Sequence, residues 1–298
     1  MNIIRYKYLF LTIAGVLVLA SIGAVIFWGM KLGTDFTGGA ILEIEYPQGR
    51  PQMSELKKSV DALSLGEVTF EPLEEKGVLL RGRALDEESH QKILSRLRQL
   101  GLVEERRFDA IGPTIGHELK VRSIIAIVVA SVLIILYIAW AFRKVSRPVA
   151  SWKYGVVAVF ALLHDVILPA GIFSVLGHFR GVEIDSLFIT ALLTIMGFSV
   201  HDTIVVFDRT RENLSKPHVN EPYAQIVNKS INETMARSIT TSLTVLLVLF
   251  AIFFFGGQTT HYFSLALIVG IAFGMYSSIF VASPLLVLWD EVYTKKKI

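Results

Sequence analysis

Two His-Asp pairs lie inside long apolar stretches of the sequence, where ionisable side chains are rare. One pair is His164 and Asp165, and the other is His201 and Asp202. If these stretches cross a membrane, a charge near the bilayer centre costs at least about 2.5–3.5 kcal/mol, so each carboxyl group needs a partner or a purpose. A carboxylate can take up and release a proton, and a neighbouring imidazole can either pass that proton on or serve as a hydrogen-bonding group of fixed tautomer. The pairs therefore favour proton transfer through a membrane.

A third polar group follows in the next apolar stretch. Thr240, Thr241 and Thr244 lie three, four and seven residues after Arg237, so all four share one face of a helix. We expect this face to lie opposite the two carboxylates, with the hydroxyl groups holding bridging waters. Two other interpretations stay open. The hydroxyl and imidazole groups could join neighbouring helices as structural hydrogen-bonding groups, or the His and Asp side chains could bind a metal ion.

The motifs of soluble enzymes are absent from the sequence. There is no Gly-x-x-x-x-Gly-Lys-Ser/Thr loop for ATP phosphates, and the chain has no cysteine. His117 and Glu118 begin like a zinc-protease motif, but Val121 occupies the position of its second histidine. An intramembrane aspartyl protease that uses Asp165 and Asp202 is the enzyme alternative. We predict instead a non-enzymatic protein without a cofactor, and a transporter without a nucleotide site is expected to be passive or driven by an ion gradient.

The elements that must position these residues are six apolar blocks. The chain has 298 residues, of which 53% are hydrophobic and 18% charged, and its mean hydropathy is +0.55. About 20 residues of helix cross the bilayer core of about 30 Å. The sequence therefore predicts six transmembrane helices, at residues 9–29, 121–142, 154–176, 187–207, 239–255 and 262–289.

Basic residues border these blocks mainly on one side. By the positive-inside rule, both termini of this multi-pass membrane protein are expected to be cytoplasmic. The basic residues point to membrane lipid and not to nucleic acid. The first block is expected to be a retained anchor, because its apolar run is longer than that of a cleaved signal peptide. The basic residues on the cytoplasmic side are Arg5, Lys7, Arg143, Lys144, Arg147, Lys153, Arg209, Arg211, Lys216, Lys229, Lys295, Lys296 and Lys297.

The polar region between the first two blocks shows the periodicity of a small folded domain. Leu42, Ile44 and Tyr46 alternate with Glu43 and Glu45, as in a half-buried strand. Two helical repeats and three further strand-like runs follow, and Asp86 is the expected N-cap of the second helix. The order β-α-β-β-α-β predicts an extracytoplasmic α+β domain of ferredoxin-like fold. The expected division of the chain is 1–29, 30–120 and 121–298.

A glycine-rich segment leads into this domain. Gly38 and Gly39 follow Asp35 and Phe36, and we expect a tight entry into the first strand there. Residues 32–39, LGTDFTGG, resemble the Gly-Gly motif that follows the first span in SecD and SecF proteins. Residues 191–212, ALLTIMGFSVHDTIVVFDRTRE, and 228–247, NKSINETMARSITTSLTVLL, are similar to the fourth and fifth spans of the SecF family. His164, Asp165 and Val166 match its third-span pattern.

The resemblance implies a function. The SecD/SecF family belongs to the resistance-nodulation-division (RND) superfamily, in which a SecF-type half pairs with SecD. The pair assists the SecYEG channel and the SecA motor, with YajC and YidC as further partners, in moving a preprotein with the energy of proton flow. The family's proton-relay carboxylate corresponds to Asp202, and its fifth-span arginine to Arg237. His201 and Phe198 depart from the pattern, which usually has Asn and Tyr there.

A rival within the same superfamily is a proton-coupled exporter of small molecules or lipids. Such an exporter needs large outer domains to build a substrate pocket. The region between the first two apolar blocks, roughly 90 residues, is too small for that. The sequence therefore favours the SecF-type function.

Overall fold

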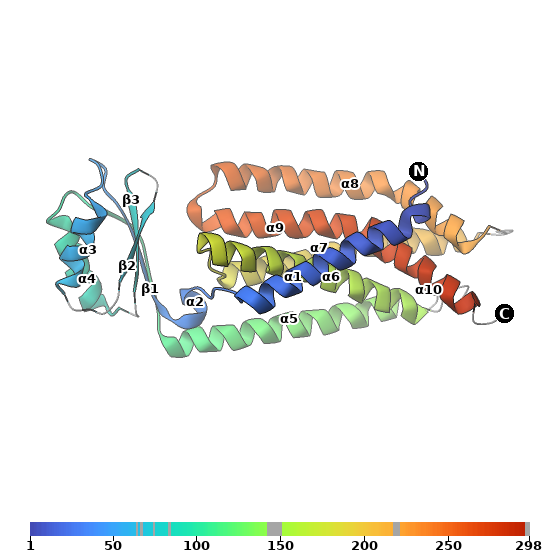
Figure 1. The fold of residues 1–298 in the computed structure, drawn as a ribbon, viewed down its shortest axis with the longest axis horizontal. Helices are drawn as coiled ribbons and strands as arrows, with labels where there is room; N and C mark the ends of the chain where they lie inside the picture. Colours follow the sequence, from blue (N-terminus) through green and yellow to red (C-terminus); the bar gives the residue numbers. More distant parts are fainter. Residues whose placement is uncertain are drawn as a thin grey trace. The chain divides into compact units, whose positions relative to one another are not determined.

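The chain forms two compact units. The computed structural model describes residues 1–63, 65, 68–73, 75–82, 85–141, 151–216 and 221–295. One unit combines Met1–Lys31 with Ile125–Ile298, and the other is Leu32–Ile124 (Figure 1). We call them the helical unit and the α+β unit. Five of the basic residues that border the apolar blocks lie outside the described residues, namely Arg143, Lys144, Arg147, Lys296 and Lys297.

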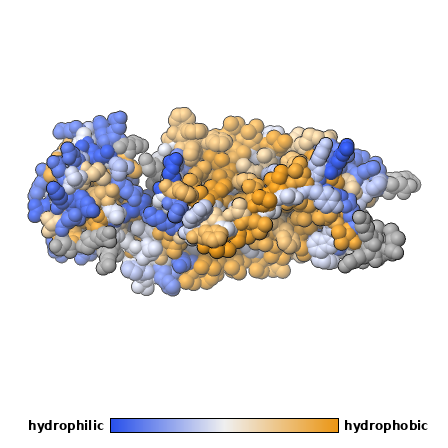
Figure 2. Space-filling model, in the orientation of Figure 1, coloured by the Kyte–Doolittle hydropathy of each residue, from blue (hydrophilic) through white to orange (hydrophobic). Residues whose placement is uncertain are grey.

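In the part of the chain that the structure describes, six helices are long and apolar enough to cross a membrane, as the sequence predicts. Four of them are single α-helices, the first joins the 3-10 turn η1 to α1, and the sixth combines α9, a π-helical segment η2 and α10. A band of hydrophobic residues covers the visible face of these helices (Figure 2). Their bounds are Lys7–Trp28 (α1, preceded by the 3-10 turn η1, Ile4–Tyr6), Pro113–Ala141 (α5), Ser151–Arg180 (α6), Ser186–Leu214 (α7), Tyr223–Phe255 (α8), Gln258–Ser277 (α9), Ser278–Ala282 (η2) and Ser283–Lys295 (α10).

The fifth span begins earlier than the sequence analysis expected. Its helix starts at Tyr223 and not at Ile239. The added turns are polar, but their buried face includes Ile226, Val227 and Ile231. Hydropathy identifies only the apolar part of the helix. The buried apolar residues on one face of the polar turns show that the helix continues toward its N-terminus.

Three of the spans form the interior of the helical unit. In the most apolar windows of α6, α7 and the sixth span, 56%, 50% and 61% of the residues are buried, against 11%, 6% and 17% in α1, α5 and α8. Both His-Asp pairs lie on interior helices, on α6 and α7. The three outer helices leave most of their apolar surface to lipid or to another protein.

Two glycines allow the helices to approach closely. A Cβ atom on Gly171 of α6 would lie 2.3 Å from the Ser21 Cβ of α1. A Cβ atom on Gly270 of α9 would lie 2.2 Å from the Ile195 Cδ1 of α7. Membrane helices are not driven together by the hydrophobic effect. Small residues at such crossings let the helices pack closely, and the van der Waals contacts stabilise the association.

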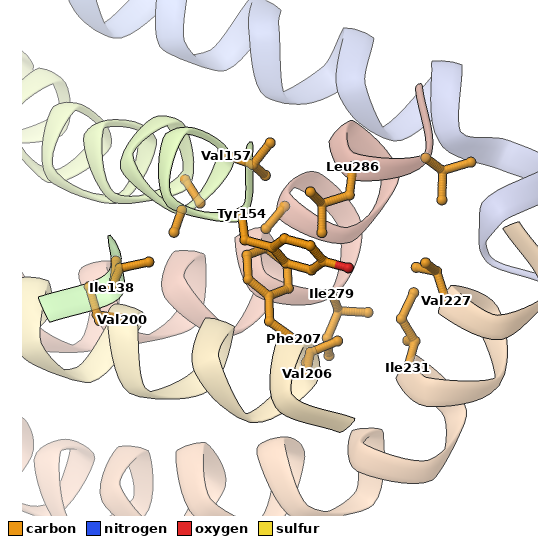
Figure 3. Packing of buried hydrophobic residues seen from close by; sticks show 14 of the residues in the cluster. Ile138, Tyr154, Val157, Val200, Val206, Phe207, Val227, Ile231, Ile279 and Leu286 are labelled. Carbon is orange, nitrogen blue, oxygen red and sulfur yellow. The ribbon is translucent and has the colours of Figure 1, made fainter. Parts of the chain in front are cut away.

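An aromatic pair anchors the hydrophobic core of the helical unit. Tyr154 of α6 packs edge-on against Phe207 of α7, with ring centroids 5.3 Å apart (Figure 3). The Tyr154 hydroxyl points toward Val227 of α8 and lies 3.1 Å from the Tyr223 hydroxyl. This contact joins the start of α8 to the interior helices.

The α+β unit has the predicted ferredoxin-like fold. Its sheet has the order β2-β3-β1-β4 with every neighbouring pair antiparallel. The predicted interior residues Leu42, Ile44, Leu56, Leu94 and Leu97 are all buried in one cluster. The elements are Gly39–Glu45 (β1), Met53–Asp61 (α3), Thr69–Leu73 (β2), Gly77–Gly82 (β3), Glu87–Arg98 (α4) and Glu104–Ile111 (β4).

The local signals at the ends of these elements are also present. The Asp86 carboxylate accepts a hydrogen bond from the Ser89 backbone N–H at 2.9 Å and so caps α4. A short helix, Thr34–Thr37 (α2), precedes β1, and Gly38 follows it with φ 74°. A Cβ atom on Gly38 would lie 2.8 Å from the Pro113 Cα atom, so only glycine fits this tight entry. Phe36 of the same motif is buried.

Candidate functional site

Asp165 joins the three interior spans of the helical unit. It lies on α6 and is completely buried. One carboxylate oxygen, Oδ2, accepts hydrogen bonds from Ser199 of α7 and from Ser277 of α9, the latter at 2.7 Å. The other oxygen, Oδ1, lies 2.8 Å from the His164 Nδ1 atom. Both oxygens of this carboxylate therefore have a partner, from a neighbouring helix or from the adjacent histidine.

His164 is held in one orientation by this contact and by aromatic rings. Its ring centroid lies 6.2 Å from that of Tyr276, to which it is stacked, and 6.3 Å from that of Phe273, which it meets edge-on. Its second nitrogen, Nε2, is buried and has no hydrogen-bond partner among the described residues. The ring therefore has one nitrogen on Asp165 and one nitrogen left to exchange a proton or to meet a water molecule.

Asp202 is buried with far less support. Its side chain lies on α7 and is 2% exposed. In the described part of the chain, its one hydrogen bond comes from the Ser242 hydroxyl of α8, at 3.3 Å, and no ion pair reaches it. A buried carboxylate without a cation or several donors is costly in its charged form. Asp202 is thus the less satisfied of the two carboxyl groups.

Several hydroxyl groups lie close to the two carboxyl groups. Thr203, the neighbour of Asp202, shares a hydrogen bond of 2.9 Å with Ser278 in the π-helical segment η2. Ser277, which precedes it, binds Asp165. Consecutive serines of the sixth span thus reach two different sites on α6 and α7, and a π-helical turn begins at that point. Such turns are frequent at functional sites.

The position expected for the arginine and threonine stripe needs correction. Arg237, Thr240 and Thr244 are exposed on α8, and Thr241 is only partly buried. The Thr244 hydroxyl donates to the backbone carbonyl of Thr241 in its own helix, at 2.8 Å. Within this chain, the stripe therefore does not face the carboxylates, and the role of these residues in coupling stays a prediction.

Serines occupy the place that the threonines were expected to take. Ser238 and Ser242 are buried on the face of α8 that meets α7. They continue a stripe of small hydroxyl residues at strict four-residue spacing, from Ser230 and Thr234. That spacing is visible in the sequence and is one residue out of phase with Arg237 and Thr241, about 100° around the helix.

The two histidines beside the carboxyl groups lie in different surroundings. His164 is buried, whereas His201 is exposed on α7. Among the described residues, no group of three or more His, Cys, Asp or Glu side chains is arranged to hold a metal ion. The arrangement offers proton-accepting groups and hydroxyl groups, which suit proton transfer.

Comparisons with known proteins point to one family. The family model for the protein export membrane protein SecD/SecF, C-terminal region, matches residues 92–292. The protein translocase subunit SecF of Thermobaculum terrenum is 42% identical, over 97% of this chain and 94% of its own length. The SecF subunit of Anaerolinea thermophila is 37% identical, over 98% and 94%.

A solved structure has the same fold. The crystal structure of SecDF from Thermus thermophilus, described as a translocon-associated membrane protein, matches with a TM-score of 0.83 and 32% identity. The match covers 98% of this chain and 39% of the SecDF chain, so this chain spans well under half of that protein. With six membrane-spanning helices and relatives that align over nearly its full length, the chain belongs to the SecD/SecF family of protein export membrane proteins, as a SecF-type member.

Proposed function

We propose that this chain is the SecF half of a SecD–SecF unit that uses the proton-motive force to assist Sec-dependent translocation of preproteins. The relatives are named as protein translocase subunits, and the similar solved structure is a SecDF protein. The unit works with the SecYEG channel and the SecA motor, and YajC and YidC are further partners. The protein is not an enzyme and needs no cofactor besides the proton gradient.

The observation that carries the proposal is the unequal environment of the two buried carboxyl groups. Asp165 has three hydrogen-bond partners, His164, Ser199 and Ser277, whereas Asp202 has, among the described residues, one long hydrogen bond from Ser242. A group that exchanges protons must be stable enough in both protonation states to alternate between them. Asp202 meets this condition if a cation approaches and favours the charged carboxylate, and then leaves and favours the protonated form. Arg237 of α8 or a residue of SecD supplies that cation.

The energy available is sufficient for such coupling. One proton that crosses 100 mV of membrane potential releases about 2.3 kcal/mol. This biases a two-state rearrangement roughly fifty-fold, because 1.4 kcal/mol corresponds to a factor of ten. Movement of one half of the unit against the other is the rearrangement that we propose.

The orientation follows from the charge pattern. We place the chain in the bacterial inner membrane with both termini in the cytoplasm and the α+β unit outside. The described basic residues at the cytoplasmic ends include Arg5, Lys7, Lys153 and Lys229. A cysteine scan with a membrane-impermeant thiol reagent tests the orientation, since the natural chain has no cysteine.

The test of the function is late-stage translocation in inverted membrane vesicles, with and without an imposed proton gradient. Asp202→Asn removes the titrating group and keeps the shape, so we expect the protein to insert and to bind SecD but to lose stimulation by the gradient. Arg237→Met should have the same effect. Full gradient-dependent stimulation by Asp202→Asn would return Asp202 to a structural role and overturn the proposed relay.

A further inference from the structure

A basic cavity lies at the end of the helical unit that carries the N-terminus. It has a volume of about 740 Å³ and is lined by N-terminal residues up to Tyr8 in the first turn of α1, by the first turns of α8 and by Glu291 of α10. Asn228 of α8 forms one wall, where its side-chain Oδ1 accepts hydrogen bonds from the backbone N–H groups of Ile3 and Ile4, at 2.8 and 3.3 Å. The cavity therefore lies between two segments that are far apart in the sequence and are joined by these hydrogen bonds.

The charges in this cavity do not cancel. Three basic side chains, Arg5, Lys7 and Lys229, line it together with Glu233 and Glu291. Both acidic groups already have cations, because Glu291 pairs with Lys7 and Glu233 pairs with Arg209, outside the cavity, at 2.7 Å. Within the described ranges of the chain, no carboxylate pairs with Arg5 or Lys229, and both side chains are exposed. The cavity thus presents two uncompensated cations that an anion can bind.

An apolar surface runs directly away from the cavity along α1. Tyr8, which lines the cavity, is 63% exposed, and Leu9, Ile13 and Val16 follow it as exposed side chains on the same helix. A tyrosine at such a point belongs to the interfacial layer of a membrane protein. Arg5 lies four residues ahead of Leu9, about 6 Å along a helix axis, so the cations lie at headgroup level next to the hydrocarbon layer.

We infer that this cavity binds the headgroup of an anionic phospholipid, whose acyl chains lie along the exposed face of α1. Arg5 and Lys229 would hold the phosphate group, and Asn228 keeps the two walls at a fixed separation. The apolar strip beside the cavity favours a lipid over a soluble phosphate, because a soluble anion gains nothing from Leu9 and Val16. Basic pockets between membrane helices on the cytoplasmic side are a recurring site for acidic lipids. This inference does not depend on the proposed transport function.

The test uses the full chain, purified in detergent and titrated with phosphatidylglycerol or phosphatidylcholine, with native mass spectrometry and thermal unfolding as readouts. We expect phosphatidylglycerol to remain bound and to raise the melting temperature, and phosphatidylcholine to do neither. Arg5→Gln and Lys229→Gln should each weaken the binding of phosphatidylglycerol about fivefold, the effect of roughly one cation at a membrane surface. Because both side chains are exposed, the variants should melt like the natural protein when phosphatidylcholine is present.

Lys120→Gln is the matched control, since this lysine is an exposed basic residue of α5 that does not line the cavity. It should leave the affinity unchanged. An equal loss of binding in Lys120→Gln would show diffuse attraction to net charge and overturn the site. Equal stabilisation by inorganic phosphate would assign the cavity to a soluble anion, and no preference for phosphatidylglycerol over phosphatidylcholine would also overturn the inference.

Discussion

Asp165 and Asp202 are both buried, yet they are held by unequal numbers of hydrogen-bond donors. Asp165 is bound by His164, Ser199 and Ser277, which come from three helices. A carboxylate at such a junction fixes the helices relative to one another, since Ser199, Ser277 and His164 lose this partner if the carboxylate is removed. We therefore expect a mainly structural role for Asp165, and the exchangeable proton at Asp202 stays a prediction.

The first prediction at this scale concerns Asp165. Asp165→Ala should lower the thermal stability of the purified protein strongly, because each buried donor left without a partner costs about 1–3 kcal/mol. Asp165→Asn keeps the shape and one acceptor oxygen, so its loss should be clearly smaller. Thermal unfolding in detergent measures both. Equal melting temperatures for the natural protein and Asp165→Ala would contradict the structural role.

A second prediction separates the two hydroxyl faces of α8. Ser242→Ala removes the hydrogen bond that reaches Asp202 in the described part of the chain and should reduce gradient-dependent translocation in vesicles. Thr244→Val should cause a milder loss, because the Thr244 hydroxyl donates to the Thr241 carbonyl of its own helix. If Thr244→Val proves the more harmful change, the exposed face of α8 carries the proton path together with the partner.

From the sequence, the positions of the buried carboxyl groups were predicted better than the helix faces that meet them. Both His-Asp pairs were found because ionisable residues stand out in apolar stretches. Ser199, Ser242 and Ser277 were missed, since a serine in a membrane helix is common and carries no charge. The spacing of Thr241 and Thr244 predicts a shared face correctly, but it cannot tell which neighbour that face meets.

At the scale of single elements, α4 illustrates how local signals and packing combine. Asp86 caps its first turn, and Ile93, Leu94 and Leu97 are buried against the sheet. Leu94→Ala should destabilise the α+β unit by about 2–5 kcal/mol. Leu94→Asp would bury an unpaired charge and should unfold the unit. Circular dichroism of a fragment covering residues 32–111 measures this, and a natural fragment without a cooperative melt would contradict an independently folding unit.

The α+β unit should also lose stability in alkaline solution. Burial raises the pKa of the Tyr46 hydroxyl from its ordinary value of 10.0 to about 12, and this hydroxyl donates to the Leu97 carbonyl of α4 at 3.2 Å. The stabilising contribution is complete below pH 10 and is lost as the pH rises through 12, because the unfolded chain releases the proton first. Chemical denaturation at pH 8 to 12 should show a smaller decline for Tyr46→Phe. An identical decline in both proteins would assign it to other groups.

Predictions of the elements were most accurate where periodicity was strong. The four strands and the helices α3 and α4 follow the expected order, and the alternating residues Leu42 and Ile44 of β1 are buried as expected. The start of α8 was placed sixteen residues too late, at Ile239 and not at Tyr223. A polar helical extension packed against a membrane bundle has too little apolar content to be recognised by hydropathy.

For the whole molecule, the exposed outer helices indicate an incomplete assembly. On the exposed face of α8, the polar side chains of Arg237, Thr240 and Thr244 lie beside apolar side chains. The apolar residues are Ile239 and Leu243. An arginine and hydroxyl groups are poorly suited to lipid. In RND-type transporters, two repeats related by an axis along the membrane normal complete each other, so a second half is expected to cover this face.

This leads to a prediction about assembly. A tagged SecD-like protein should co-purify with the chain, and cysteines introduced at Thr240 and in the matching SecD helix should cross-link. A cysteine at Val128, exposed on α5, serves as a control site. If the chain alone is monodisperse and supports gradient-dependent translocation, the second half is not required.

The π-helical segment η2 has a consequence for changes in chain length. A turn closed by bonds from residue i to i+5 contains one residue more than an α-helical turn. Deleting Phe280 would convert the π-helical turn into regular α-helix. Ser277 and Leu286 would then still point toward the same neighbouring helices. A deletion elsewhere in a span rotates all that follows by about 100°. We therefore expect the sixth span to tolerate the loss of one residue at this point, whereas a deletion in α7 beside Ser199 would separate Asp202 from Ser242.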